Sequence, residues 1–191
     1  MINWIPQPLS AYLHLIINDL VMRPLITTLA ILLALTCSCE KKPTLEGEIH
    51  IFLLSDAATQ DPLWETEESN LVRELVPLIE YKDILSYDSV DFIFKISNTA
   101  QENLEGQESN LHSRAFVVVA NGENIYTGYF WASYSSASCP WLTIDPIHAQ
   151  YSGELRTALG YPWLMEDMSI PDRRNDGRIL SILRHDRKLI E

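Results

Sequence analysis

The sequence predicts an α+β fold in which two to four helices pack on a mostly antiparallel sheet with a central Asn-Gly hairpin. Three observations predict this class. Strand-like and helix-like segments follow one another as strand, helix, strand, helix, hairpin, strand and helix. Two apolar runs flank Asn121-Gly122, and the last segment carries apolar residues at helical spacing. Of the 191 residues, 47% are hydrophobic and 21% are charged, which is typical of a single globular domain.

Residues 1–39 are predicted to be an N-terminal extension followed by a secretory signal peptide. From Met22, one arginine precedes a mostly apolar run over 25–36, and small polar residues follow. This run is shorter than the roughly 18 to 20 residues that span a bilayer, which favours a cleaved signal over an uncleaved anchor. Residues 1–21 hold a second, broken apolar stretch. It favours Met22 as the translation start, with a long leader or a membrane-packed first segment as the alternatives.

Two cysteines end this segment. The stretch Leu35-Thr36-Cys37-Ser38-Cys39 resembles the lipobox of bacterial lipoproteins, although Thr36 stands where an aliphatic residue is usual. The resemblance implies that Cys39 carries the lipid, palmitate among its acyl chains, because Ser38 suits the position before the cut and Thr36 does not. Residues 40–47 are then a tether to one globular domain over 48–191. We expect this domain outside the cytoplasm, lipid-anchored to the inner or outer membrane of the cell envelope.

The first elements of the domain follow in order. Residues 48–55 are rich in β-branched and apolar side chains, which predicts a buried strand. Residues 67–79 carry apolar residues at helical spacing, with a proline near the end that stops or kinks the predicted helix. Apolar and polar residues alternate over 90–96, as in a half-buried strand. Capping oxygens at 97–99 then begin a short helix that Gly106 closes.

The second half contains the clearest local signal. Asn-Gly between the apolar runs 115–120 and 125–131 predicts a tight hairpin, because both turn residues must accept positive φ. A further strand is expected over 141–144, and a helical turn over 153–159. An irregular segment follows over 161–171.

The final element is a helix. Asn175-Asp176 provides its cap, and the apolar residues of 179–183 share one face, which Lys188-Leu189 could extend.

Two resemblances add to these patterns. The order Val90-Asp-Phe-Ile-Phe-Lys-Ile-Ser, a short helix, then Ala115-Phe-Val-Val-Val-Ala-Asn-Gly resembles the head subdomain of the first periplasmic region of the SecD-type export subunit. This likeness covers residues 88–131 and implies a fold more than a function. Cys-Glu-Lys-Lys at 39–42 and the ending Ile-Pro-Asp-Arg-Arg-Asn-Asp-Gly-Arg at 170–178 resemble uncharacterised Bacteroidota-type lipoproteins, a likeness that implies no activity.

Charge and residue spacing exclude several classes of function. The net charge of −12 is too acidic for nucleic acid, whose phosphates require Lys and Arg. The acidic residues concentrate between Asp56 and Glu108, which favours a solvated face over a cation site or a basic partner. Five histidines are scattered without metal-ligand spacing, so we expect no metal and no cofactor.

Side chains that could contact a ligand are most concentrated within 126–148, where aromatic rings and hydroxyl groups follow the hairpin. The side chains concerned are Tyr129, Trp131, Ser133, Tyr134, Ser135, Ser136, Ser138, Cys139, Trp141, Asp145 and His148. Such residues are typical of a surface that binds a ligand. The alternative is that the aromatic residues pack in the core and the serines belong to a loop without a binding role. From it we take a candidate binding surface. Its residues are Trp131, Tyr134, Ser136, Cys139 and Trp141, together with Arg173 and Arg174 near the last helix.

Both Cys139 and the two arginines of this surface could have a functional or a purely structural role. Cys139 would be a nucleophile if His112 or His148 lay beside it, and is otherwise a buried, inert thiol. The arginines could bind an anion at a helix start, or pair with neighbouring acidic residues. No recognisable catalytic signature surrounds these residues.

We therefore expect a lipid-anchored cell-envelope protein, a non-catalytic interaction or ligand-binding module. The alternatives are an envelope hydrolase that uses Cys139 or the serine-rich loop, and an accessory factor of protein export. The expected partners are the membrane, through the lipid anchor, and an envelope protein or a glycan. A flat aromatic patch would favour the protein or glycan, whereas an enclosed pocket would favour a small ligand.

Overall fold

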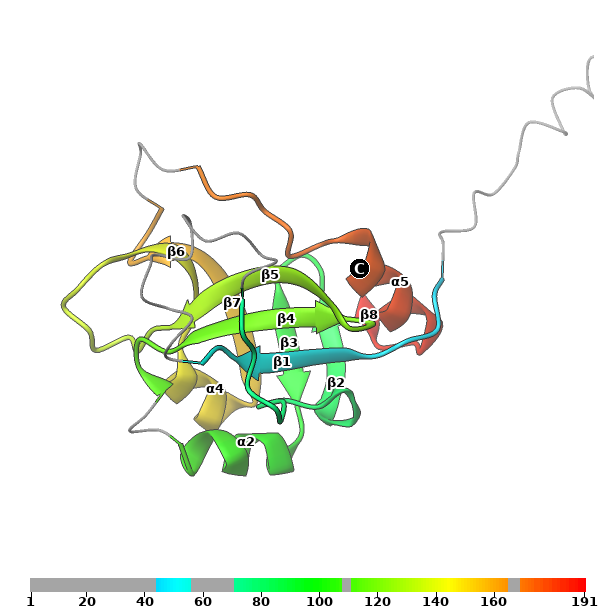
Figure 1. The fold of residues 1–191 in the computed structure, drawn as a ribbon, viewed down its shortest axis with the longest axis horizontal. Coiled ribbons are helices and arrows are strands. Elements are labelled where there is room, and N and C mark those ends of the chain that lie inside the picture. Colours follow the sequence, from blue (N-terminus) through cyan, green and yellow to red (C-terminus); the bar gives the residue numbers. More distant parts are fainter. Residues whose placement is uncertain (1–43, 56–70, 108–110, 165–168) are drawn as a thin grey trace, which may run out of the picture. The chain divides into compact units, whose positions relative to one another are not determined.

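The computed structural model describes residues 44–55, 71–107, 111–164 and 169–191, and these contain eight strands and three α-helices (Figure 1). The strands are β1 (Ile49–Leu53), β2 (Ile84–Asp88), β3 (Ile93–Ile96), β4 (Ala115–Ala120), β5 (Glu123–Phe130), β6 (Cys139–Ile144), β7 (Glu154–Tyr161) and β8 (Leu189–Ile190). The helices are α2 (Asn98–Glu105), α4 (Pro146–Ser152) and α5 (Gly177–His185), with a short 3-10 turn, η4 (Tyr81–Asp83). The predicted α+β class is confirmed.

One sheet joins the strands in the order β1-β4-β5-β6-β7-β3-β2-β8. Neighbours are antiparallel except for the pairs β5 with β6 and β2 with β8. Because β5 and β6 are parallel, the two strands end on the same side of the sheet. Trp131, which follows β5, and Asp145, which follows β6, are therefore neighbours in space: the Trp131 N–H donates to the carbonyl of Ile144 at 2.8 Å.

The Asn-Gly hairpin is confirmed. Asn121 and Gly122 connect β4 to β5 with φ values of 50° and 82°, the left-handed conformations that this turn needs. The Asn121 side chain also joins β1 to the turn, since its Oδ1 accepts from the Glu48 N–H at 3.0 Å. In return the Asn121 N–H donates to the carbonyl of Glu48. The turn thus ties three strands together.

The helices begin at side-chain caps. Ser97 Oγ accepts from the Ala100 N–H at the start of α2, and Asp176 Oδ1 from the Arg178 N–H at the start of α5, so both predicted caps are confirmed. Asp145 caps α4, in which Pro146 takes the first position, where a missing N–H costs nothing. Helices α2 and α4 pack against each other, and α4 packs against β7 (Figure 1).

Two predicted elements are wrong. The helix expected over 67–79 begins outside the described residues, and 71–79 is not helical. Instead this segment runs along the edge of β1, with bridges from Leu54 to Arg73 and from Ile51 to Ile79. Edge pairing satisfies backbone groups of β1 that would otherwise be open, which explains why it overrides helical spacing. The helical turn expected over 153–159 is β7, preceded by the unpredicted α4.

Two further differences are smaller. The strand expected over 90–96 starts at Ile93, after a turn in which Phe92 has a φ of 56°, and β2 precedes it without having been predicted. The last helix ends at His185, so Leu189 joins β8 and not the helix face. The core lies between the sheet and the helices and includes the fully buried rings Tyr87, Phe94, Phe116 and Phe130.

Candidate functional site

A cavity of about 320 Å³ lies where β5, β6 and the end of β7 meet the start of α4. We call it the Trp131 cavity. It is lined by Trp131, Ser133, Thr143, Asp145, His148, Arg156, Ala158, Gly160, Tyr161 and Pro162. Its volume is at the lower end of the range of small-molecule sites, about 300 to 1,000 Å³.

The aromatic wall of the cavity is held in place. Trp131 Nε1 donates to the carbonyl of Ala137 at 3.0 Å, which fixes the indole against the loop that leaves β5. The indole packs against His112, with ring centroids 5.1 Å apart. His112 is itself fixed, because its Nδ1 accepts from the Ala132 N–H at 3.3 Å. The wall is therefore formed before any ligand arrives.

A second aromatic residue lines the cavity. Tyr161, at the end of β7, donates its hydroxyl to the carbonyl of Ser133 at 2.6 Å. This bond joins the end of β7 to the loop after β5, two segments that are distant in sequence. Together Trp131 and Tyr161 give the cavity two ring systems, which supply contact area with few freely rotating bonds.

An aspartate, a histidine and an arginine also line this cavity. The Asp145 carboxylate caps α4 through its Oδ1, which accepts from the Ile147 N–H at 3.0 Å. His148 lies one helical turn further on and is exposed to solvent. Arg156 projects from β7, with Asp91 at 3.8 Å. The site thus offers an acceptor, a donor and a ring that can do either.

The arrangement does not favour a thiol nucleophile. Cys139 is 2% exposed, and burial raises the pKa of its thiol, against a smaller opposing effect of the Trp141 backbone N–H. A raised pKa keeps the thiol neutral and unreactive at pH 7. Cys139 is also absent from the cavity lining. Its geometry therefore gives the thiol hydrolase alternative no support.

Serine chemistry gains no support either. Ser133 lines the cavity with His148 and Asp145, but among the described residues no hydrogen bond links these three side chains. A serine nucleophile needs its base within hydrogen-bond reach and that base oriented by a third group. Nor do the described residues contain a cluster of three or more His, Cys, Asp or Glu that could hold a metal ion.

The structure separates the residues of the predicted binding surface. Trp131 lines the cavity, and Tyr134 lies beside it, 72% exposed and 6.0 Å from the His112 ring. Ser136 is exposed in the same loop. Trp141 is half-buried against the core and donates from Nε1 to Thr127 Oγ1 at 3.1 Å. The flat patch of Trp131, Tyr134 and Trp141 therefore does not form.

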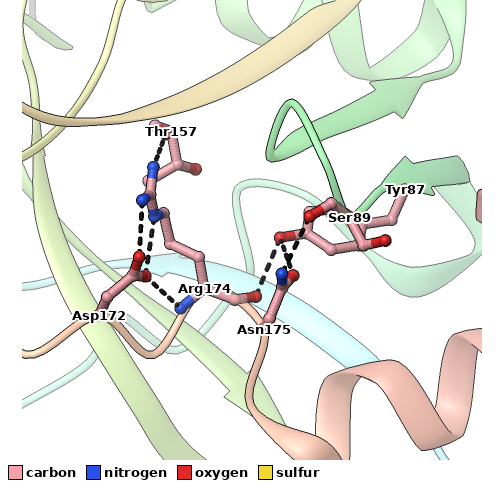
Figure 2. Close-up of polar contacts among 6 residues, drawn as sticks. All are labelled: Tyr87, Ser89, Thr157, Asp172, Arg174 and Asn175. Carbon is pink, nitrogen blue, oxygen red and sulfur yellow. Dashed lines mark hydrogen bonds and ion pairs between the residues drawn. The ribbon is translucent and has the colours of Figure 1, made fainter. Parts of the chain in front are cut away.

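The two arginines of the predicted surface lie away from the Trp131 cavity. Arg173 donates from Nη1 to the carbonyl of Ile125 at 3.2 Å. Arg174 is buried, pairs with Asp172 at 2.7 Å and donates from Nη1 to the carbonyl of Thr157 at 2.9 Å (Figure 2). The charges of this segment thus pair largely with one another. Cys39 lies outside the described residues.

Sequence reasoning missed the β7 side of the cavity. Arg156, Ala158 and Gly160 line it from that strand, and Tyr161 ends the strand. In the structure, buried and more exposed side chains alternate over Leu155, Arg156, Thr157 and Ala158. These four residue types do not alternate between apolar and polar, so the sequence held no clear strand signal here.

Among the helices of the described residues, none combines the length and the hydropathy that a membrane span requires. Neither a protein-family model, a curated protein nor a solved structure matches the chain.

Proposed function

We propose that the chain is a lipid-anchored cell-envelope protein that binds a small ligand, without transforming it, in the Trp131 cavity. The observation that carries this proposal is the cavity itself. Two aromatic rings line it together with Asp145, His148 and Arg156, and each ring is held by a hydrogen bond within the protein. A preformed wall lowers the cost of binding, because little has to be ordered when the ligand arrives.

Binding of a fragment library to the full chain, purified in detergent, tests the ligand-binding half of the proposal. Ligand-observed NMR should detect fragments that bind wild-type protein and lose binding in Trp131→Ala. Ala158→Trp should lose binding too, since it fills the cavity from an exposed strand position and removes no hydrogen bond. Trp163→Ala is the matched control, because this tryptophan is 72% exposed and does not line the cavity. Fragment binding that survives both cavity variants would contradict the proposal.

Mass spectrometry of the membrane-extracted protein tests the anchor. A mature N-terminus at Cys39 carrying diacylglycerol and an amide-linked acyl chain is the expected mass. An N-terminus at Met1 or Met22 in the membrane fraction would overturn the lipoprotein assignment.

A further inference from the structure

A second cavity adjoins the first across β7. Its volume is about 370 Å³, and it is lined by Val90, Asp91, Phe92, Arg156, Thr157, Ala158, Leu159 and Arg174. Two residues, Arg156 and Ala158, line both cavities. We call the second one the Phe92 cavity.

The strand geometry shows why the two cavities adjoin each other. Arg156 and Ala158 are alternate residues of β7, so both side chains leave the same face of the sheet and are exposed there. Of the two shared residues, Ala158 extends only a methyl group between the cavities, so Arg156 is the larger side chain there. From Arg156 to Gly160, which both line the Trp131 cavity, the strand rises roughly 13 Å, and the Phe92 cavity adds to this length. Arg156 lies at the boundary of the two halves.

We propose that the two cavities form one elongated site for a neutral oligosaccharide, with sugar rings on both sides of Arg156. This inference rests on the proposed function, since it names the ligand class of the same site. One end of the oligosaccharide packs between Trp131 and Tyr161, and the other end extends towards Phe92.

The charges around the groove support an uncharged ligand. Asp91 and Asp145 face Arg156 and Arg174 along the two cavities, and Arg174 is already paired with Asp172. With its charges close to balance, the groove favours neither an anion nor a cation. A fully apolar ligand is equally disfavoured, because it would remove these charged groups from water without replacing their hydrogen bonds.

Sugar hydroxyls satisfy the same groups. A carboxylate can only accept hydrogen bonds and a guanidinium can only donate them, whereas each hydroxyl does both. A chain of hydroxyl-bearing rings can therefore bond Asp91, Asp145 and Arg156 at once. The apolar faces of the rings match the aromatic side chains Trp131 and Tyr161, which provide area for stacking.

The far end of the groove is as firmly built as the near end. The Arg174 guanidinium lies 3.6 Å from the centroid of the Phe92 ring, and its bonds to Asp172 and the Thr157 carbonyl hold it there (Figure 2). Arg156 is different. Its side chain is 52% exposed, and its contact with Asp91 is 3.8 Å long, so turning towards a ligand costs little.

Isothermal titration calorimetry on the full chain, in a detergent without a sugar headgroup, tests the inference. The probes are neutral fragments of glucan, mannan, xylan and chitin of two, three and four units. At least one series should bind, and its affinity should rise about tenfold or more from two units to four, as contacts in the Phe92 cavity are added.

Three variants locate the two halves of the site. Val90→Trp adds bulk at an exposed residue of the Phe92 cavity alone, and should remove the gain with length while leaving two-unit affinity within about twofold. Arg156→Ala should weaken four-unit binding about tenfold, the effect of losing a charged hydrogen bond. Lys95→Ala removes a cation from neighbouring β3 that lines neither cavity, and should change nothing.

The outcomes separate this inference from the proposed function. If no oligosaccharide binds, while fragments still bind wild-type protein and not Trp131→Ala, the ligand-binding proposal stands and the elongated sugar site is overturned. Affinity that does not depend on chain length, or that ignores Val90→Trp, also overturns it. If neither class of probe binds at the Trp131 cavity, both proposals fail.

Discussion

Removing Arg174 should destabilise the domain far more than removing Arg178, although the two arginines make nearly the same local contacts. In each case the arginine follows an aspartate by two residues, and its backbone N–H and Nε both donate to that aspartate's Oδ1. In each case Nη2 donates to the Oδ2 atom. The pairs Asp172–Arg174 and Asp176–Arg178 therefore form a matched comparison. They differ in burial: the Arg174 side chain is 9% exposed and that of Arg178 is 38% exposed.

The expected magnitude follows from what each guanidinium contacts. Arg174→Ala loses the bond to the Thr157 carbonyl, the contact over Phe92 and the ion pair with Asp172. Breaking a buried pair costs about 3 to 5 kcal/mol when the remaining charge stays buried. The Asp172 side chain is 41% exposed and regains water, so we expect a loss of about 3 kcal/mol, near the lower limit. Arg178→Ala breaks an exposed pair, worth about 0 to 1 kcal/mol.

Urea denaturation followed by circular dichroism measures the free energy of unfolding of both variants and of the wild type. The midpoint should shift strongly for Arg174→Ala and little for Arg178→Ala, with similar dependence on urea in all three. If the two variants differ by less than about 1 kcal/mol, burial does not set the strength of these pairs and the reasoning is refuted.

Three further outcomes are expected. Because its thiol is buried, Cys139 should resist iodoacetamide in folded protein and react after denaturation, with the modified peptide identified by mass spectrometry. Modification of the folded protein as fast as the denatured protein would show instead that the thiol is accessible. Gly128→Ala should lower the free energy of unfolding by about 1 to 3 kcal/mol in urea titrations, because its Cβ would lie 2.4 Å from the buried Phe116 ring, and an unchanged midpoint would contradict this packing. Hydrogen bonds from their arginines hold the pKa of Asp172 and of Asp176 below the ordinary value. The stability that these ionised carboxylates contribute is therefore fully present above about pH 4, and it should decrease at lower pH as they take up protons. Asp172→Asn should show a smaller fall than wild type in urea titrations across that range, and an equal fall would assign the pH dependence to other groups.

The local sequence was sufficient to predict those parts of the fold in which a few neighbouring residues decide the backbone conformation. The Asn121-Gly122 turn was predicted because positive φ at two successive positions is a demand that these residues meet at low cost. The starts of α2 and α5 were predicted because Ser97 and Asp176 bond backbone N–H groups two or three residues away. These interactions involve no distant part of the chain.

The local sequence did not predict the secondary structure of segments that pair with strands distant in the chain. Residues 71–79 have helical spacing, yet the open edge of β1 pairs with them. Residues 154–161 became a strand because β6 and β3 bond them from both sides. Helix α4, which has its own local cap at Asp145, connects the antiparallel strands β6 and β7.

For the candidate site, the sequence by itself determined that aromatic and hydroxyl-bearing residues gather in the loop after the hairpin, and that Trp131 is among them. Only the tertiary structure decided which of them form a cavity. Trp141 and Cys139 pack against the core, whereas Trp131 lines a cavity together with Tyr161 and Arg156 from β7. The physical reason is that a cavity is made by segments that approach in space, and strand pairing across the sheet, not local propensity, brings them together.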